Sequence, residues 1–227
     1  ERLEETGAKD LSGALTALSP SFSFPQSPQG AFAGSIAQGA SLRGLASDQV
    51  LVLVNGKRRH SSANVTRQSL ANGRGAAAVD LSLIPLSAVE RVEILRDGAA
   101  AQYGSDAIAG VINIILKNNS SGGSASALYG QYENRVGGKG NFGARGQGQI
   151  NQGFELPNDG FFSLSADIGI QESSNVAGAV PARTSIYFPV NGGADPRENG
   201  DSRYRQQLGQ PRSQTYNFGY NAELPLT

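Results

Sequence analysis

The chain lacks cysteine, methionine and tryptophan, and it has a single histidine. Without cysteine, a disulfide framework, a thiolate metal site and a thiol nucleophile are excluded. With one imidazole, at His60, the chain alone can form neither a multi-histidine metal site nor a Ser-His-Asp triad. The absence of methionine predicts a processed, excised or truncated product. We therefore expect no catalytic residue, no cofactor and no metal ion.

Charge is scarce and balanced, with 19 basic against 19 acidic residues. A dedicated nucleic-acid-binding protein usually has a basic excess, so no nucleic-acid partner is expected. No run approaches the roughly 18 apolar residues of a membrane-spanning helix, and no signal-peptide pattern opens the chain. Membrane strands stay possible, because they are short and only alternately apolar.

The first part of the chain predicts one helix and one buried strand. Leu11, Leu15 and Leu18 share a helical face, and Asp10 suits the N-cap position before them. The run VLVLV at 50–54 predicts a strand buried on both faces, because its residues are all apolar. Asn55-Gly56, which follows at once, is typical of a hairpin turn.

The stretch from 81 to 117 predicts further strands. Pro85 can begin a short helix that runs through Glu90, because the first helical turn needs no N–H from that residue. In 91–95, Val92 and Ile94 point one way and Arg91, Glu93 and Leu95 the other, which indicates a half-buried strand. The apolar run 111–116 predicts a more fully buried one.

After a linker-like segment, NNSSGG at 118–123, the pattern changes to alternation. Apolar and polar residues alternate over 142–150, 162–171 and 215–224, and more weakly over 124–132. Each run is close to the ~9–11 residues that cross a bilayer as a tilted strand. An ordinary soluble antiparallel sheet with one wet face is the alternative.

The predicted connections between these strands differ in length. LPNDG, at 156–160, suits a short turn, whereas 172–213 is long, polar and rich in glycine, proline and asparagine. Short turns at one end and long loops at the other are typical of outer-membrane strands.

Three separated motifs resemble the plug domain of TonB-dependent outer-membrane receptors. They are SLRG at 41–44, DQVLVLVNGKRRH at 48–60 and IPLSAVERVEILRDGAAAQYGSDAIAGVINIILK at 84–117. The resemblance covers about residues 10–118. It implies an α+β plug domain at 1–118, with a small mixed sheet and short helices. Antiparallel strands of an incomplete outer-membrane β-barrel are implied at 119–227.

The same resemblance implies a function and partners. The chain is expected to be a fragment of an energy-coupled transporter in the cell's outer membrane. An extracellular small ligand, such as a metal chelate or an oligosaccharide, would bind the plug, and TonB would open a path by pulling on an N-terminal box. No segment before Leu11 resembles that box, so TonB is expected to act through a segment not present here.

Candidate ligand contacts lie in two plug loops. The resemblance assigns them, by position, to Ser47, Asp48, Arg58, Arg59, His60, Arg67 and Arg74. Between Gln49 and Val79 the sequence has cations and no carboxylate, and guanidinium groups suit carboxylate or phosphate. Alternatively, these cations pair with acidic residues of a barrel wall. The resemblance also implies that Arg43 and Arg96 contact the barrel.

A soluble or surface β-rich ligand-binding module, without transport, is the alternative function. One hydrophobic core shared by both halves of the chain, with the apolar positions of the later strands packed inside it, would favour that module.

Overall fold

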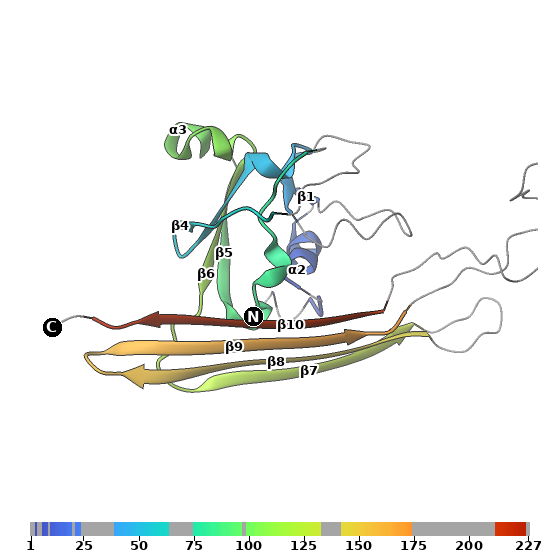
Figure 1. Cartoon of the computed structure of the whole chain (residues 1–227), viewed down its shortest axis with the longest axis vertical. Helices are drawn as coiled ribbons and strands as arrows, with labels where there is room; N and C mark the ends of the chain where they lie inside the picture. The colour runs from blue at the N-terminus through green and yellow to red at the C-terminus, as the bar shows by residue number, and fades with distance from the viewer. Residues whose placement is uncertain are drawn as a thin grey trace, which may run out of the picture.

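The structure, a computed structural model, describes residues 3, 6–8, 10–19, 21–23, 39–63, 75–96, 99–132, 142–173 and 212–225. They form two bodies, here termed the plug (residues 3–117) and the wall (strands β7–β10), and the plug stands on one side of the wall (Figure 1). In the plug the longer elements are α2 (Leu11–Leu18), β3 (Val50–Val54), β5 (Val89–Leu95), α3 (Ala99–Tyr103) and β6 (Gly110–Leu116). Its shorter elements are β1 (Phe22–Ser23), β2 (Ser41–Leu42), β4 (Lys57–Arg58) and the 3-10 turns η1 (Ser47–Gln49), η2 (Leu81–Leu83), η3 (Leu86–Ala88) and η4 (Ser105–Ala107).

The plug contains the expected small mixed sheet, in the order β4-β3-β6-β5. Strand β3 is parallel to β6, and the β3–β4 and β5–β6 pairs are antiparallel. The prediction of a strand buried on both faces is confirmed. Val50 and Val52 enter the main core, whereas Leu51 and Leu53 pack with Ala107 and Val111 in a second cluster.

The predicted helix and hairpin turn are also confirmed. Asp10 caps α2, because its Oδ1 accepts a hydrogen bond from the Gly13 backbone N–H at 2.9 Å. Leu11 and Leu15 are buried, but Leu18, on the same face, is 44% exposed because it lies beyond the core. The turn between β3 and β4 places Asn55 at φ 49° and Gly56 at φ 74°, as a two-residue hairpin loop of this sequence requires.

The expected short helix from Pro85 through Glu90 is wrong. Only the 3-10 turn η3 forms, and β5 already begins at Val89. Val89 pairs with Leu116 of β6, and the Lys117 N–H donates to the Ala88 carbonyl at 2.9 Å. Pairing with β6 therefore prevails over continued helix, in a segment whose branched residues favour strand.

The wall consists of β7 (Gly123–Tyr132), β8 (Phe142–Leu156), β9 (Gly160–Gln171) and β10 (Ser213–Glu223). These strands form an antiparallel sheet in the order β10-β9-β8-β7, which confirms the alternation-based prediction. Asn158 and Asp159 make the predicted short turn between β8 and β9, with φ of 59° and 57°. The predicted long connection, which covers most of 172–213, lies outside the described residues.

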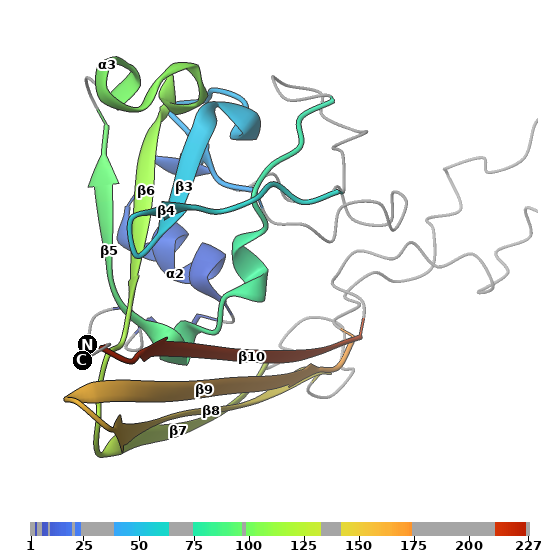
Figure 2. The same ribbon diagram turned by 60° about the vertical axis from the view of Figure 1, so that its left-hand side comes forward.

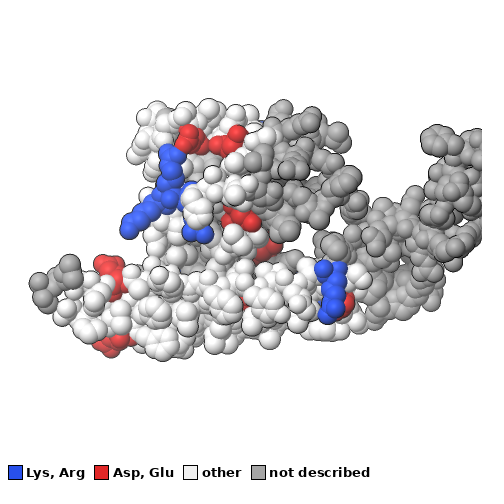
Figure 3. Space-filling model, in the orientation of Figure 1, with Lys and Arg blue, Asp and Glu red and all other residues white. Residues whose placement is uncertain are grey.

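The two faces of the wall differ in chemistry and burial. Side chains on the face away from the plug are apolar and exposed, for example Ile168 at 43%, Phe218 at 69% and Tyr220 at 71%. On the opposite face Ser163 and Ser165 are each only 2% exposed. In Figure 3 the middle of the visible side of the wall is uncharged in its described residues, and charges lie toward its two ends.

The main hydrophobic core belongs to the plug alone. Its buried members run from Leu11 to Ile114, and the apolar positions of the wall strands are not among them. The halves therefore do not share one core in the described residues, which disfavours the module alternative. Among the helices of the described residues, none has the length and apolar character needed to span a membrane.

Candidate functional site

Residues 82–88 of the plug, here termed the docking loop, contact the polar face of the wall (Figure 2). The backbone N–H groups of Leu86 and Ser87 donate to Asp167 Oδ2 on β9, at 2.5 and 3.4 Å. Beside them, Asn217 Nδ2 on β10 donates to the Ser82 carbonyl at 2.8 Å. The wall thus holds this loop by its backbone.

Close packing adds to these hydrogen bonds at Gly219. A Cβ at this position would lie 3.2 Å from Cγ of Pro85, tighter than most carbon contacts in proteins. Glycine therefore lets β10 approach the docking loop closely, next to the Asn217 contact.

Three further polar contacts lie toward the short-turn end of the strands, and the first two of them join plug and wall. Asn221 Nδ2 donates to the Lys117 carbonyl at 3.0 Å, and Asn55 Nδ2 donates to Asn221 Oδ1 at 3.2 Å. Ser163 donates to Asn119 Oδ1 at 2.7 Å. Because these three contacts are hydrogen bonds between neutral groups, water molecules could take the place of either partner.

The wall stabilises its own polar face beneath the plug. Asn151 Nδ2 lies 2.9 Å from the hydroxyl oxygens of both Ser163 and Ser165. All three side chains are buried, so these bonds satisfy groups that would otherwise be costly to remove from water.

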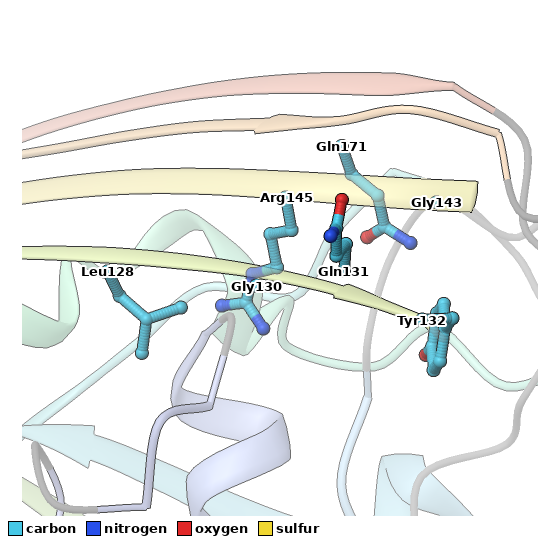
Figure 4. A pocket seen from close by; sticks show the side chains of 7 residues that line it. All are labelled: Leu128, Gly130, Gln131, Tyr132, Gly143, Arg145 and Gln171. Atoms are coloured by element: carbon cyan, nitrogen blue, oxygen red, sulfur yellow. The ribbon is translucent and has the colours of Figure 1, made fainter. Parts of the chain in front are cut away.

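A cavity of about 330 Å³ lies at the opposite end of the wall, where the strands lead into the predicted long connections. Figure 4 shows its lining, which consists of Leu128, Gly130, Gln131, Tyr132, Gly143, Arg145 and Gln171. Arg145 reaches the plug here, because its Nη1 donates to the Gly7 carbonyl at 3.4 Å, and it also contacts Gln147. A guanidinium among amide groups and a phenol can bind an anionic or hydroxyl-rich group.

The predicted ligand contacts lie in and near η1 and β4. Ser47 is half-buried and Asp48 exposed in η1, which packs against η4. Arg58 is exposed on the edge strand β4, and Arg59 donates its backbone N–H to the Val52 carbonyl at 2.9 Å. His60, directly after them, is exposed. Arg67 and Arg74 lie outside the described residues.

Arg58 has a partner that the sequence did not indicate. Its guanidinium forms an ion pair with Asp106 in η4, and both side chains are about half exposed. The hydrogen bond from Arg58, together with its charge, lowers the pKa of Asp106 below the ordinary value. For Arg58, the acidic partner in the described residues comes from the plug; the pairing of the other cations with a barrel wall stays a prediction. In Figure 1, β4 lies toward the short-turn end of the wall.

The two arginines expected to contact the barrel lie together within the plug. Arg43 Nη1 donates to the Arg96 carbonyl at 3.1 Å, and Arg96 Nη2 donates to the Ser19 hydroxyl at 3.0 Å. Arg43 adopts a positive φ of 57°, just after β2. The structure therefore brings this predicted pair together at one end of the plug.

Sequence reasoning missed Asp167, Asn217, Gly219 and Arg145. All four belong to the polar side of the alternation, where the pattern shows only that a residue does not face lipid. The available signal was Asp167, a carboxylate in the middle of a run whose other polar-side members are neutral.

Parts of this chain are similar to known proteins. A family model described as TonB-dependent Receptor Plug Domain matches residues 1–111. The chain is 44% identical over 79 residues, 35% of its length, to the iron-regulated outer membrane virulence protein of Vibrio cholerae. It is 41% identical over 118 residues, 52% of its length, to the vitamin B12 transporter BtuB of Vibrio cholerae. These matches span only 11% and 16% of the two relatives.

Among solved structures, the siderophore receptor PirA from Acinetobacter baumannii is similar at 28% identity and a TM-score of 0.47. The match covers 61% of this chain and 19% of that receptor.

Proposed function

We propose that this chain supplies the plug and the first wall strands of an outer-membrane transporter, because a family model described as TonB-dependent Receptor Plug Domain matches residues 1–111. The transporter binds an extracellular ligand and gates its energy-coupled uptake. We assign residues 1–118 to the plug domain and residues 119–227 to the first part of the barrel, and TonB is the partner that drives opening.

The observation that carries this proposal is the two-faced wall. Its apolar face is exposed along the strands, and its polar face holds the plug through Asp167, Asn217 and Asn221. A soluble module would leave Phe218 and Tyr220 in water, whereas a bilayer covers them. The polar face then lines a lumen that the plug fills.

The ligand class follows from the relatives' names. Named relatives include a vitamin B12 transporter and, in Escherichia coli, a ferrienterobactin receptor. We assign this chain a bulky metal chelate of the same general kind, with an oligosaccharide as the alternative. Ser47, Asp48, Arg59, His60, Arg67 and Arg74 stay the proposed contacts. Arg58 is the weakest candidate of the group, since its guanidinium already pairs with Asp106.

Removal of the plug from the full-length protein tests the proposal. The variant that lacks residues 1–118 should still reach the outer membrane and should make cells permeable to an antibiotic too large for general porins, because the lumen loses its stopper. The intact protein in the same membrane is the control. A protein that fractionates away from the outer membrane, or a plugless variant that inserts without raising permeability, contradicts the proposal.

A further inference from the structure

Asp167 stands apart from the other polar groups beneath the plug. It is the only charged side chain among the buried residues of the described part of the chain, and it is 6% exposed. A buried carboxylate is stable only where donors surround it, because it can only accept hydrogen bonds. Gln149 on the wall approaches it at 3.4 Å, and the shortest donor, at 2.5 Å, is the Leu86 backbone N–H of the plug.

We propose that Asp167 is the positioning residue that holds the docking loop on the wall, and that breaking its contact with Leu86 and Ser87 is the step that unseats the plug here. This inference rests on the proposed function, because unseating is meaningful only for a plug that moves. Both donors are backbone groups, so recognition depends on the path of the loop and not on its side chains.

The contact also leaves hydrogen-bonding groups unused. Asp167 Oδ1 and the Ser87 hydroxyl are both buried, and neither has a hydrogen-bond partner among the residues that the structure describes. Unsatisfied buried polar atoms weaken a contact, and water that enters the gap can satisfy both of them. The contact between Asp167 and the docking loop is therefore specific, because the charge of the carboxylate is compensated there. It is also easier to break than an interface in which every polar group is hydrogen-bonded.

The loop and the wall are otherwise matched by neutral contacts. Pro85 packs against Gly219, and Asn217 binds the Ser82 carbonyl. These contacts define where the loop lies, while Asp167 accepts the two charge-assisted hydrogen bonds, from Leu86 and Ser87. Substitution of Asp167 should accordingly loosen the loop more than substitution of a wall residue that does not touch the plug.

A cysteine reporter in the full-length receptor tests this. Ser87→Cys is conservative, because Ser87 is 3% exposed and its hydroxyl has no hydrogen-bond partner among the described residues. This chain contains no cysteine of its own. The rate at which a water-soluble maleimide labels the thiol, in membranes, measures how often the docking loop leaves the wall. Any cysteine elsewhere in the full-length receptor is first replaced by serine.

The reporter is combined with Asp167→Ala and, separately, with Ser165→Ala. Asp167→Ala should raise the labelling rate by about tenfold or more, since it removes a charge-assisted bond. Ser165→Ala is the matched control, because Ser165 lies on the same wall face and its hydroxyl accepts a hydrogen bond from Asn151 of the wall. Its labelling rate should equal that of the reporter alone. An unchanged rate in Asp167→Ala, or an equal rise in Ser165→Ala, overturns the proposal.

Asp167→Asn keeps the test decisive if the alanine variant fails to fold. Asparagine retains one acceptor oxygen without the charge, so labelling should be faster than in the reporter alone and slower than in Asp167→Ala. A rate equal to that of the reporter alone overturns the proposal. The labelling rate can be measured on purified receptor in detergent. A negative result for the contact of Asp167 with the docking loop is then distinguished from a failure of outer-membrane targeting or of transport.

Discussion

At the scale of single residues, the wall buries polar side chains and exposes apolar ones. Asn151, Ser163 and Asp167 are buried, while Ile150 is 51% and Phe218 is 69% exposed. In water this distribution would be unfavourable, but a bilayer on one side and a plug on the other make both choices favourable. Within the plug the usual distribution of soluble proteins holds, because leucine, isoleucine and valine side chains form the buried core.

Gly110 is a residue at which the plug tolerates no side chain. Its φ is 141°, and a Cβ there would lie 2.7 Å from the Leu95 carbonyl oxygen. Gly110→Ala should therefore destabilise the plug by about 2 kcal/mol or more. Limited proteolysis of the plug in the full-length receptor, across a denaturant series, measures this. Gly148→Ala is the control, because a Cβ there meets nothing within 4 Å; equal sensitivity of both variants would contradict the expectation.

The Arg58–Asp106 pair predicts a pH dependence. Because Arg58 lowers the pKa of Asp106 in the folded plug, the pair stabilises the fold above the unfolded pKa of about 3.9. That stabilisation is lost as the pH falls through the lower, folded pKa. The difference in melting temperature between the parent and Asp106→Asn should be present at neutral pH and vanish in acid. Since the pair is exposed, the difference should be small and should shrink with added salt; a difference that grows in acid would rule out this cause.

At the scale of elements, local patterns predicted the strands well and their ends poorly. Alternation over 162–170 was sufficient for β9, because one lipid-facing and one lumen-facing side impose a period of two. Around Pro85 the local preference for a helical turn was outweighed by pairing with β6, which no local pattern contains. The contact between the docking loop and the wall could not be predicted from local patterns either, because Leu86 and Asp167 are 81 positions apart.

Neighbouring positions on β7 test the assignment of the wall's faces. Ala127 pairs with Gly148 on the exposed apolar face, whereas Ser126 pairs with Gln149 on the polar face. Ala127→Arg should cost about 2–4 kcal/mol for folding into lipid vesicles if it lies near the bilayer midplane. Ser126→Arg, at the adjacent residue, should cost much less. Urea titration of folding into vesicles measures both, and equal costs would show that the faces are misassigned.

At the scale of the whole molecule, plug and wall are two bodies joined by a polar interface, and the hydrophobic core lies in the plug. The resemblance of 84–117 to a known plug predicted the first body, and alternation predicted the second. How they meet could not be predicted: the charge of Asp167 marks it within its run, but the sequence does not show what lies opposite it, and Asn217 and Asn221 resemble the other neutral polar-side residues. The ion pair of Arg58 with Asp106 could not be predicted from local sequence either, because 48 positions separate the partners.

The most direct test of the account is a nitroxide scan of β10 in the full-length receptor in bilayers. Accessibility to lipid-dissolved oxygen should be high at Tyr216, Phe218 and Tyr220. It should be low at the intervening Asn217, Gly219 and Asn221, which face the plug. A period of two with this phase is the predicted result. Equal exposure of both sets to a water-soluble relaxation agent, or the opposite phase, would contradict a wall that lies between lipid and plug.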